Sequence, residues 1–138
     1  MGTILRISEA ANLGIHAMVF LCLHPDQGPS NVGAIAEGLG VSASHLAKVL
    51  QRLAAAGMVS SVRGVKGGFS LRCDPARTTL LAIYEAIDGP LVPAGCLVEL
   101  DTCLIDHCWL AGLEAETLER VRAHLGGLHL ADLVPRRT

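Results

Sequence analysis

The sequence has few aromatic residues, with one Trp, one Tyr and two Phe among 138 residues. It is nevertheless 51% hydrophobic, so its core must be built from Leu, Val, Ile and Ala. A β-sandwich usually contains more aromatic and β-branched residues, and this composition therefore favours packed helices. The length is that of one domain with a modest core.

Long apolar runs are also missing. The longest wholly apolar run covers residues 17–23, whereas a helix needs about 20 such residues to cross a bilayer. No charged segment precedes this run and no small-residue cleavage site follows it, so we do not expect a signal peptide. These features predict a cytoplasmic protein that does not associate with membranes.

Acidic residues are missing from the middle of the chain. Residues 38–73 contain no Asp or Glu, and their charged residues are Lys48, Arg52, Arg63, Lys66 and Arg72. Residues 85–119 contain only acidic charges and no Lys or Arg. An anionic polymer would be attracted to the first segment and repelled by the second, which makes nucleic acid a candidate partner despite the net charge of −2.

Capping residues and apolar periodicity predict the secondary structure. We expect helices over about residues 8–23, 31–39, 43–56, 80–87 and 107–125. The predicted N-caps are Ser8, Asn31 or Ser30, Ser42, and Thr78 or Thr79. Alternation predicts two strands over residues 58–62 and 68–72, joined by a glycine-rich basic turn. Helix-ending glycines are expected at Gly40, Gly57, Gly89 and the pair Gly126 and Gly127.

The order helix, tight turn, capped helix and basic hairpin is typical of a winged helix-turn-helix. The third predicted helix would bury Leu46, Val49, Leu50 and Leu53 and expose Ser44, His45, Lys48, Gln51 and Arg52. Polar side chains near its start, such as Ser44 and His45, could reach base edges in the major groove. Lys48 and Arg52 are better placed to bind phosphates, and the hairpin would bring Arg63 or Lys66 to a phosphate or the minor groove. The alternative is a helical domain whose surface charges are only solvated.

The chain resembles the bacterial winged helix-turn-helix regulators of the IscR/NsrR type (Rrf family). The resemblance covers nearly the whole chain and rests on LRISEAANLGIHAM, VSASHLAKVLQRLAAAGMVSSVRGVKGGFSL, TLLAIYEAIDGPL and LADLV, with VRGxxGG the most specific piece. It implies a mainly α fold with a small β-hairpin wing and a long C-terminal dimerisation helix. Residues 1–90 would be the DNA-binding domain, residues 91–106 a cysteine-rich cluster-binding loop, and residues 107–138 the dimerisation helix and tail.

The resemblance also implies a homodimer that binds a double-stranded DNA operator. Apolar residues recur at helical spacing in the last long helix, at Leu110, Leu113, Leu118, Val121 and Leu125. This stripe is more than one small monomer needs to bury. A dimer would present two recognition helices to a two-fold DNA site.

The chain has five cysteines, and the odd number without a secretion signal argues against a disulfide framework. Cys22 lies in an apolar run and is expected in the core, and Cys73 has no assigned role. Cys96, Cys103 and Cys108 stand together in an acidic stretch. In the resembling family three cysteines of this loop hold a [2Fe-2S] or [4Fe-4S] cluster, so the resemblance implies these three as ligands of an iron–sulfur cluster.

The fourth ligand of such a cluster is left open. Ala111 and Asn12 stand where two branches of the family place it, so the candidates are His16, Glu9 and then His107. A cluster-free thiol-redox or zinc-containing regulator is the alternative. No HExxH or Cys-His-Asp arrangement indicates an enzyme. The sequence therefore predicts a sequence-specific transcriptional repressor that senses nitric oxide, redox state or iron–sulfur status.

Overall fold

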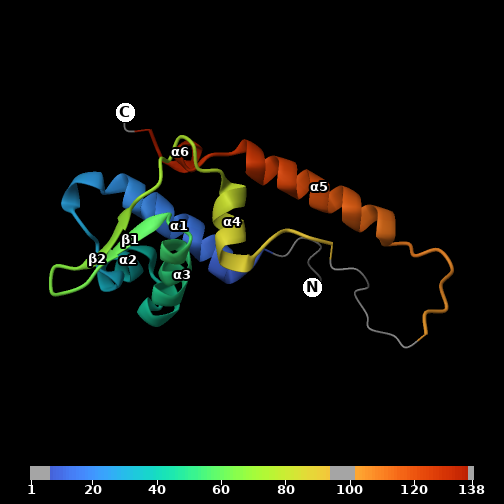
Figure 1. Ribbon diagram of the computed structural model, residues 1–138, viewed down its shortest axis with the longest axis horizontal. Helices are drawn as coiled ribbons and strands as arrows, with labels where there is room; N and C mark the ends of the chain where they lie inside the picture. Colours follow the sequence, from blue (N-terminus) through green and yellow to red (C-terminus); the bar gives the residue numbers. More distant parts are fainter. Residues whose placement is uncertain (1–6, 94–101, 137–138) are drawn as a thin grey trace.

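The computed structural model describes residues 7–93 and 102–136 (Figure 1). It contains α1 (Glu9–Leu23), η1 (Pro25–Gln27), α2 (Val32–Leu39), α3 (Ala43–Ala55), β1 (Val59–Val62), β2 (Gly68–Leu71), α4 (Leu80–Asp88), α5 (Ala111–Gly127) and α6 (Leu130–Leu133). The fold is mainly helical with one two-stranded antiparallel hairpin, as predicted. Cys96, one of the three predicted cluster ligands, lies outside the described residues.

Side-chain caps begin the four helices of the N-terminal domain. In each, a side-chain oxygen accepts a hydrogen bond from a backbone N–H three residues later. The pairs are Ser8 with Ala11 N at 2.9 Å, Asn31 with Ala34 N at 2.7 Å, Ser42 with His45 N at 3.4 Å and Thr79 with Ala82 N at 3.1 Å. Each bond pairs one of the backbone N–H groups that a helix start leaves without a partner. Of the alternative caps predicted for α2 and α4, Asn31 rather than Ser30 and Thr79 rather than Thr78 are therefore the ones present.

The core lies between α1, α3 and α4, with α2 covering one end. Its fully buried side chains are aliphatic or Met, among them Met18, Ile35, Leu46, Leu50 and Ile83, each at 0% exposure. Gly14 of α1 faces both α3 and α4. A Cβ there would lie 2.1 Å from Ile87 Cδ1 and 3.2 Å from Val49 Cγ1, so any larger residue at position 14 would require the Ile87 side chain to move.

The helix-turn-helix consists of α2, a short turn and α3. Gly40 ends α2 with a φ of 68°, a left-handed conformation that glycine adopts without steric cost. The hairpin follows α3, with Val59 opposite Leu71 and Val62 opposite Gly68. Ser30 also pairs with Phe69 through two backbone hydrogen bonds of 2.9 and 2.8 Å. This bridge joins β2, close to the turn of the hairpin, to the segment that enters α2.

The bounds of α5 differ from the prediction at both ends. The helix begins at Ala111 rather than at residue 107, because no side chain caps its start and a turn joins Ala111 N to Cys108 O at 3.4 Å. It continues through Gly126 and Gly127 instead of ending before them. Beyond the helix, Leu80 N donates to Leu128 O and Leu130 N donates to Thr78 O, both at 2.9 Å. The helix thus ends where the chain pairs with the residues that precede α4.

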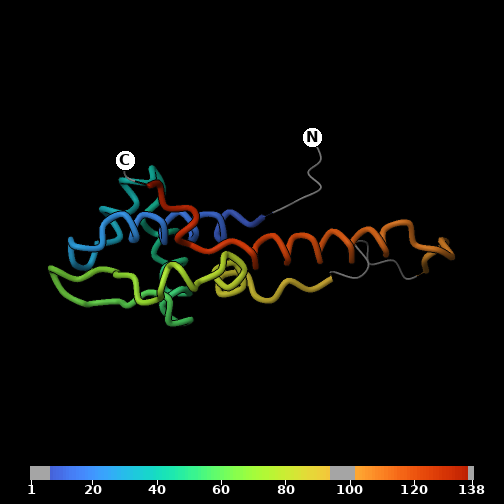
Figure 2. The backbone as a smooth tube through the Cα atoms, turned by 90° about the horizontal axis from the view of Figure 1, so that it is seen from above, coloured from blue at the N-terminus to red at the C-terminus, as the bar shows by residue number. Residues whose placement is uncertain are grey.

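Most of α5 extends away from the other helices, and only its C-terminal part lies beside α4 (Figures 1 and 2). None of its 17 residues is buried, and Leu113 is 53% exposed. An isolated helix of this length is marginally stable in water, so α5 lacks in one protomer the packing that stabilises most helices. None of the helices in the described part of the chain is both long and apolar enough to span a bilayer.

Candidate DNA-binding face and cysteine segment

The recognition helix α3 has the predicted two faces. Leu46, Val49, Leu50 and Leu53 are buried, whereas Ser44, Lys48 and Gln51 are exposed. The hydroxyl oxygens of Ser42 and Ser44 lie 3.0 Å apart, a contact that the sequence pattern did not indicate. The exposed face carries a cation and short polar groups at the helix start, which suits entry into the major groove.

Arg52 differs from Lys48 although both had been predicted to bind phosphates. The Arg52 guanidinium donates from Nη1 to the carbonyl oxygen of Ile87 at 3.2 Å. Ile87 is in the last turn of α4, so this bond joins the recognition helix to the end of α4. A guanidinium has five N–H donors, and a phosphate contact by Arg52 remains a prediction.

The wing presents Arg63 and Lys66 at an exposed tip, and Val65 between them is fully exposed. Glycine is required at the tip for steric reasons. A Cβ at Gly67 would lie 2.1 Å from the Val62 carbonyl oxygen, and one at Gly68 would lie 2.2 Å from that of Ser30. The backbone can therefore fold tightly here and leave the two cations free to contact DNA.

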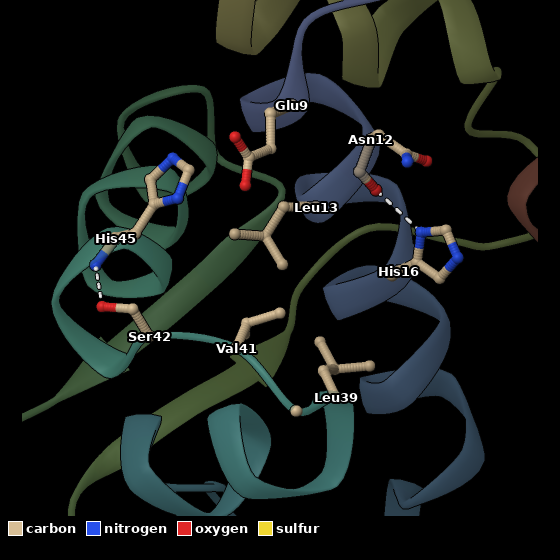
Figure 3. Close-up of a pocket in the computed structure, with 9 residues that line it drawn as sticks. Glu9, Asn12, Leu13, His16, Leu39, Val41, Ser42 and His45 are labelled. Carbon is tan, nitrogen blue, oxygen red and sulfur yellow. Dashed lines mark hydrogen bonds between the residues drawn. The ribbon is translucent and has the colours of Figure 1, made fainter.

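A groove of about 430 Å³ separates α1 from the start of α3 (Figure 3). Its lining includes Glu9 and His16 of α1 and Ser42 and His45 at the start of the recognition helix. Figure 3 shows Glu9 between the two helices, while the His16 ring lies at the other edge of α1, turned away from His45. The fold thus places the Glu9 carboxylate beside the start of α3, which lies in the segment of the sequence without acidic residues.

The His16 ring at the edge of this groove is bonded to the backbone of its own helix. Its Nδ1 lies 2.9 Å from the backbone oxygen of Asn12, and a carbonyl oxygen can only accept a hydrogen bond. The Nδ1 atom must therefore carry the proton, and in the neutral ring Nε2 keeps its lone pair. Metal-binding histidines usually have such a bond on the nitrogen that does not bind the metal.

The cysteine segment, defined as residues 91–108, has two exposed thiols, Cys103 and Cys108, among the residues that the structure describes. Cys103 Sγ donates to the Ile105 carbonyl oxygen at 3.8 Å, and His107 is also exposed. Within residues 7–93 and 102–136, no three His, Cys, Asp or Glu side chains are close enough to hold a metal ion. The thiols are suitable donors for iron–sulfur clusters and zinc, but this part of one protomer does not form a complete site.

Two further thiols, Cys22 and Cys73, are half-buried and pack against the core. Burial, and to a smaller extent the nearby Cys73 thiol, raise the pKa of Cys22 from 9.0 to about 11. A raised pKa keeps the thiol protonated at neutral pH, and the thiolate is the reactive form. Cys22 is therefore a structural residue, as its place in the sequence predicted.

Alkylation by iodoacetamide tests this assignment. At pH 8 we expect Cys22 of the folded protein to react roughly 100-fold more slowly than Cys22 of the urea-unfolded protein, because a pKa two units higher leaves about 100-fold less thiolate. The rate in the folded protein should rise with pH up to about 11. Peptide mass spectrometry after timed labelling gives both rates, and equal rates in the two states would contradict the raised pKa.

The cysteine segment leaves α4 through Leu91, whose two backbone groups both have side-chain partners. Leu91 N donates to Glu85 Oε1 at 3.2 Å, and the Arg122 guanidinium donates to the Leu91 carbonyl oxygen. Arg122 also lies 3.6 Å from Glu119 in an ion pair on α5. Glu85 and Arg122 could not be identified from the sequence, because nothing in their spacing shows that α4 and α5 meet beside Leu91.

Comparisons with known proteins agree with this architecture. A model of the Rrf2 family, described as "Iron-dependent Transcriptional regulator", matches residues 7–136. The chain is 31% identical to the HTH-type transcriptional regulator IscR of Xenorhabdus nematophila and 30% identical to that of Serratia proteamaculans. Each match spans 130 residues and covers 94% of this chain and 79% of the relative.

Solved structures show the same fold. CymR of B. subtilis, named as its global cysteine regulator, matches with a TM-score of 0.75 and 28% identity over 94% of this chain and 96% of that one. IscR of T. potens matches with a TM-score of 0.74 and 27% identity over 94% and 86% of the two chains. The relatives are named as transcriptional regulators, which confirms the prediction of a regulator rather than an enzyme. The chain belongs to the Rrf2 family of winged-helix transcriptional regulators.

Proposed function

We propose that this protein is a homodimeric, sequence-specific DNA-binding repressor, acting in the cytoplasm, whose cysteine segment holds an iron–sulfur cluster. The observation that carries the proposal is the pair of exposed thiols, Cys103 and Cys108, just before a helix that has no buried residue. The apolar stripe of α5 is left in contact with water in a lone protomer, which is unfavourable. A second protomer on α5 and a cluster on the thiols would give both a role.

The homodimer would be formed through α5. The helix carries Leu113, Leu118, Val121 and Leu125, which are exposed or only half-buried in one protomer. Packing the same stripe of a second copy against them would remove apolar surface from water. It would also place two recognition helices and two wings on one two-fold DNA site.

The cluster would be held by Cys96, Cys103 and Cys108, with a fourth ligand from α1 of the other protomer. His16 is our first choice, because its Nδ1 is already bonded to a carbonyl and leaves Nε2 as the free donor. Glu9 is the second choice, since it lines the same groove, and His107 is the third. When bound, the cluster would supply a centre that reacts with nitric oxide and oxidants, of either the [2Fe-2S] or the [4Fe-4S] type.

The groove would link this site to DNA. Its α1 wall contains the candidate ligands and its other wall contains Ser42 and His45 at the start of α3. A cluster bound by both α1 and the partner's cysteine segment would move α1. It would thereby shift the start of the recognition helix α3 relative to α3 of the other protomer. Ser44, His45, Lys48, Arg52, Arg63 and Lys66 remain the proposed DNA contacts. Occupancy of the site would then select between dimers that do and do not match the operator.

A cluster-free thiol or zinc regulator is the second candidate. It is supported by the exposure of Cys103 and Cys108, which suits thiol oxidation or zinc binding. Both candidates predict a dimer that binds DNA. They differ in what the purified protein contains.

Anaerobic purification separates the two candidates. We expect a coloured protein containing iron and acid-labile sulfide, whose affinity for a duplex selected from a random-sequence pool changes on exposure to nitric oxide. A colourless protein without iron or sulfide, with unchanged DNA binding after cluster reconstitution, would favour the thiol or zinc regulator. DNA binding at low salt, measured on the same samples, tests independently whether the protein binds DNA at all.

A further inference from the structure

We infer that α4 transmits the state of the cysteine segment to the recognition helix, with Glu85, Arg122 and Arg52 as the positioning residues. The inference rests on the proposed function, because it requires a cysteine segment with two states. It adds a physical connection inside one protomer, made by three hydrogen bonds that no sequence motif indicated. It also gives Arg52 a role other than phosphate binding.

The first part of the connection is at Leu91, the start of the cysteine segment. Its N–H is bound by Glu85 of α4 and its carbonyl oxygen by Arg122 of α5. Both side chains are only partly exposed, so water screens these contacts less than those of a fully exposed pair. A rearrangement of the segment that displaces Leu91 must therefore break these bonds or move α4 with it.

The second part is the end of α4, at Ile87. Its side chain is 6% exposed and fills the space beside Gly14 of α1 and Val49 of α3. Its carbonyl oxygen accepts the hydrogen bond from Arg52 of α3. Close-packed contacts of this kind transmit small displacements because they cannot be compressed. The position of Ile87 therefore determines both the packing and one hydrogen bond of the recognition helix.

The two parts are joined by a short and restricted link. Only Asp88, Gly89 and Pro90 separate Ile87 from Leu91. The Gly89 N–H donates to Glu85 O at 2.9 Å, which closes the last turn of the helix, and proline restricts the backbone that follows. A shift at Leu91 consequently reaches Ile87 within one helical turn. Through Arg52 it changes the position of α3, which carries Lys48.

The test measures the ratio of operator affinities between two states of the same variant. The two states are the anaerobically purified cluster-loaded protein and the same protein after removal of the cluster by a chelator, both titrated with one duplex selected from a random-sequence pool by the wild type. Allosteric coupling typically changes affinity by roughly 5–150-fold. We expect the wild-type ratio to lie in this range and the ratio for Arg52→Gln, Glu85→Ala and Arg122→Met to fall within about twofold of one.

Two controls separate transmission from other effects. Lys48→Ala should lower affinity in both states and reduce the slope of log affinity against log salt by about one, because it removes one phosphate contact, and it should leave the ratio unchanged. Glu85→Gln keeps an oxygen that can accept from Leu91 N, so it should restore the ratio lost in Glu85→Ala. All variants should keep the iron content and the thermal midpoint of the wild type.

The outcomes distinguish the inference from the function on which it rests. If the wild type responds to the cluster and the three variants respond equally well, the connection through α4 is wrong while the proposed function stands. If Arg52→Gln lowers affinity and the salt slope as Lys48→Ala does, with an unchanged ratio, Arg52 is a phosphate contact. A wild type whose affinity is the same in both states would overturn the proposed function and the connection together.

Discussion

Replacement of Cys103 or Cys108 by Ser is expected to remove the iron–sulfur cluster. Serine keeps the size of the side chain but replaces a soft thiolate by a hydroxyl, a poor ligand for these clusters. Loss of a residue that only supports a metal ligand typically lowers metal affinity roughly 10–100-fold, and loss of a ligand should cost at least as much. We therefore expect anaerobically purified C103S and C108S to contain less than about a tenth of the wild-type iron and sulfide.

The fold should survive these substitutions, which makes the result interpretable. Both thiols are exposed, and the hydrogen bond from Cys103 to Ile105 O is long at 3.8 Å. Cys73→Ser is the matched control, since this thiol is half-buried near the base of the wing and is not a predicted ligand. C73S should keep its iron. If C103S and C108S also keep wild-type iron and sulfide, these two residues are not the ligands.

The same reasoning ranks the candidates for the fourth ligand. His16→Ala, Glu9→Ala and His107→Ala each remove one candidate and leave the three cysteines in place. Because the Nδ1 atom of His16 is bonded to a carbonyl, we expect H16A to alter the absorption spectrum most. A [2Fe-2S] or [4Fe-4S] assignment would follow from the same spectra.

The sequence predicted the N-terminal domain well because its signals are local. A cap residue, an apolar stripe and a terminal glycine each act within one helical turn, so Ser8, Ser42 and Gly40 could be recognised without knowledge of the fold. The wing was recognised for the same reason, since its alternation and glycine-rich turn lie in one short segment. The expected strands over residues 58–62 and 68–72 differ from β1 and β2 by one residue at two of their four ends.

The remaining features depend on contacts between distant segments. The end of α5 was mispredicted because residues 128–130 pair with residues 78–80, and the pairing carries the helix past two glycines that would otherwise end it. Arg52 has a hydrogen-bond acceptor that its place on α3 did not indicate, because Ile87 is 35 positions away; its phosphate contact stays a prediction. The approach of Glu9 to the start of α3 equally required the fold. Local patterns contain no information on such pairs.

Introduction of a charge into the apolar stripe of α5 is expected to produce a monomer. Leu118→Asp would place a carboxylate where the second protomer packs, and an unpaired charge in such an interface is strongly unfavourable. Size-exclusion chromatography with light scattering should therefore show half the wild-type mass. Loss of the second half-site contact should lower operator affinity roughly 10²–10⁴-fold, which is the usual advantage of linking two binding modules.

Ala123→Asp is the matched control for this variant. It adds the same charge to the same helix, but Ala123 is exposed and lies five residues from Leu118, on a different face. It should remain dimeric and bind DNA like the wild type. Because none of the residues of α5 is buried in one protomer, L118D should keep the folded N-terminal domain. Its non-specific binding to DNA at low salt should therefore match that of the wild type, and should depend on Lys48 and on the salt concentration in the same way. A dimeric L118D with wild-type operator affinity would show that the protomers associate through another surface.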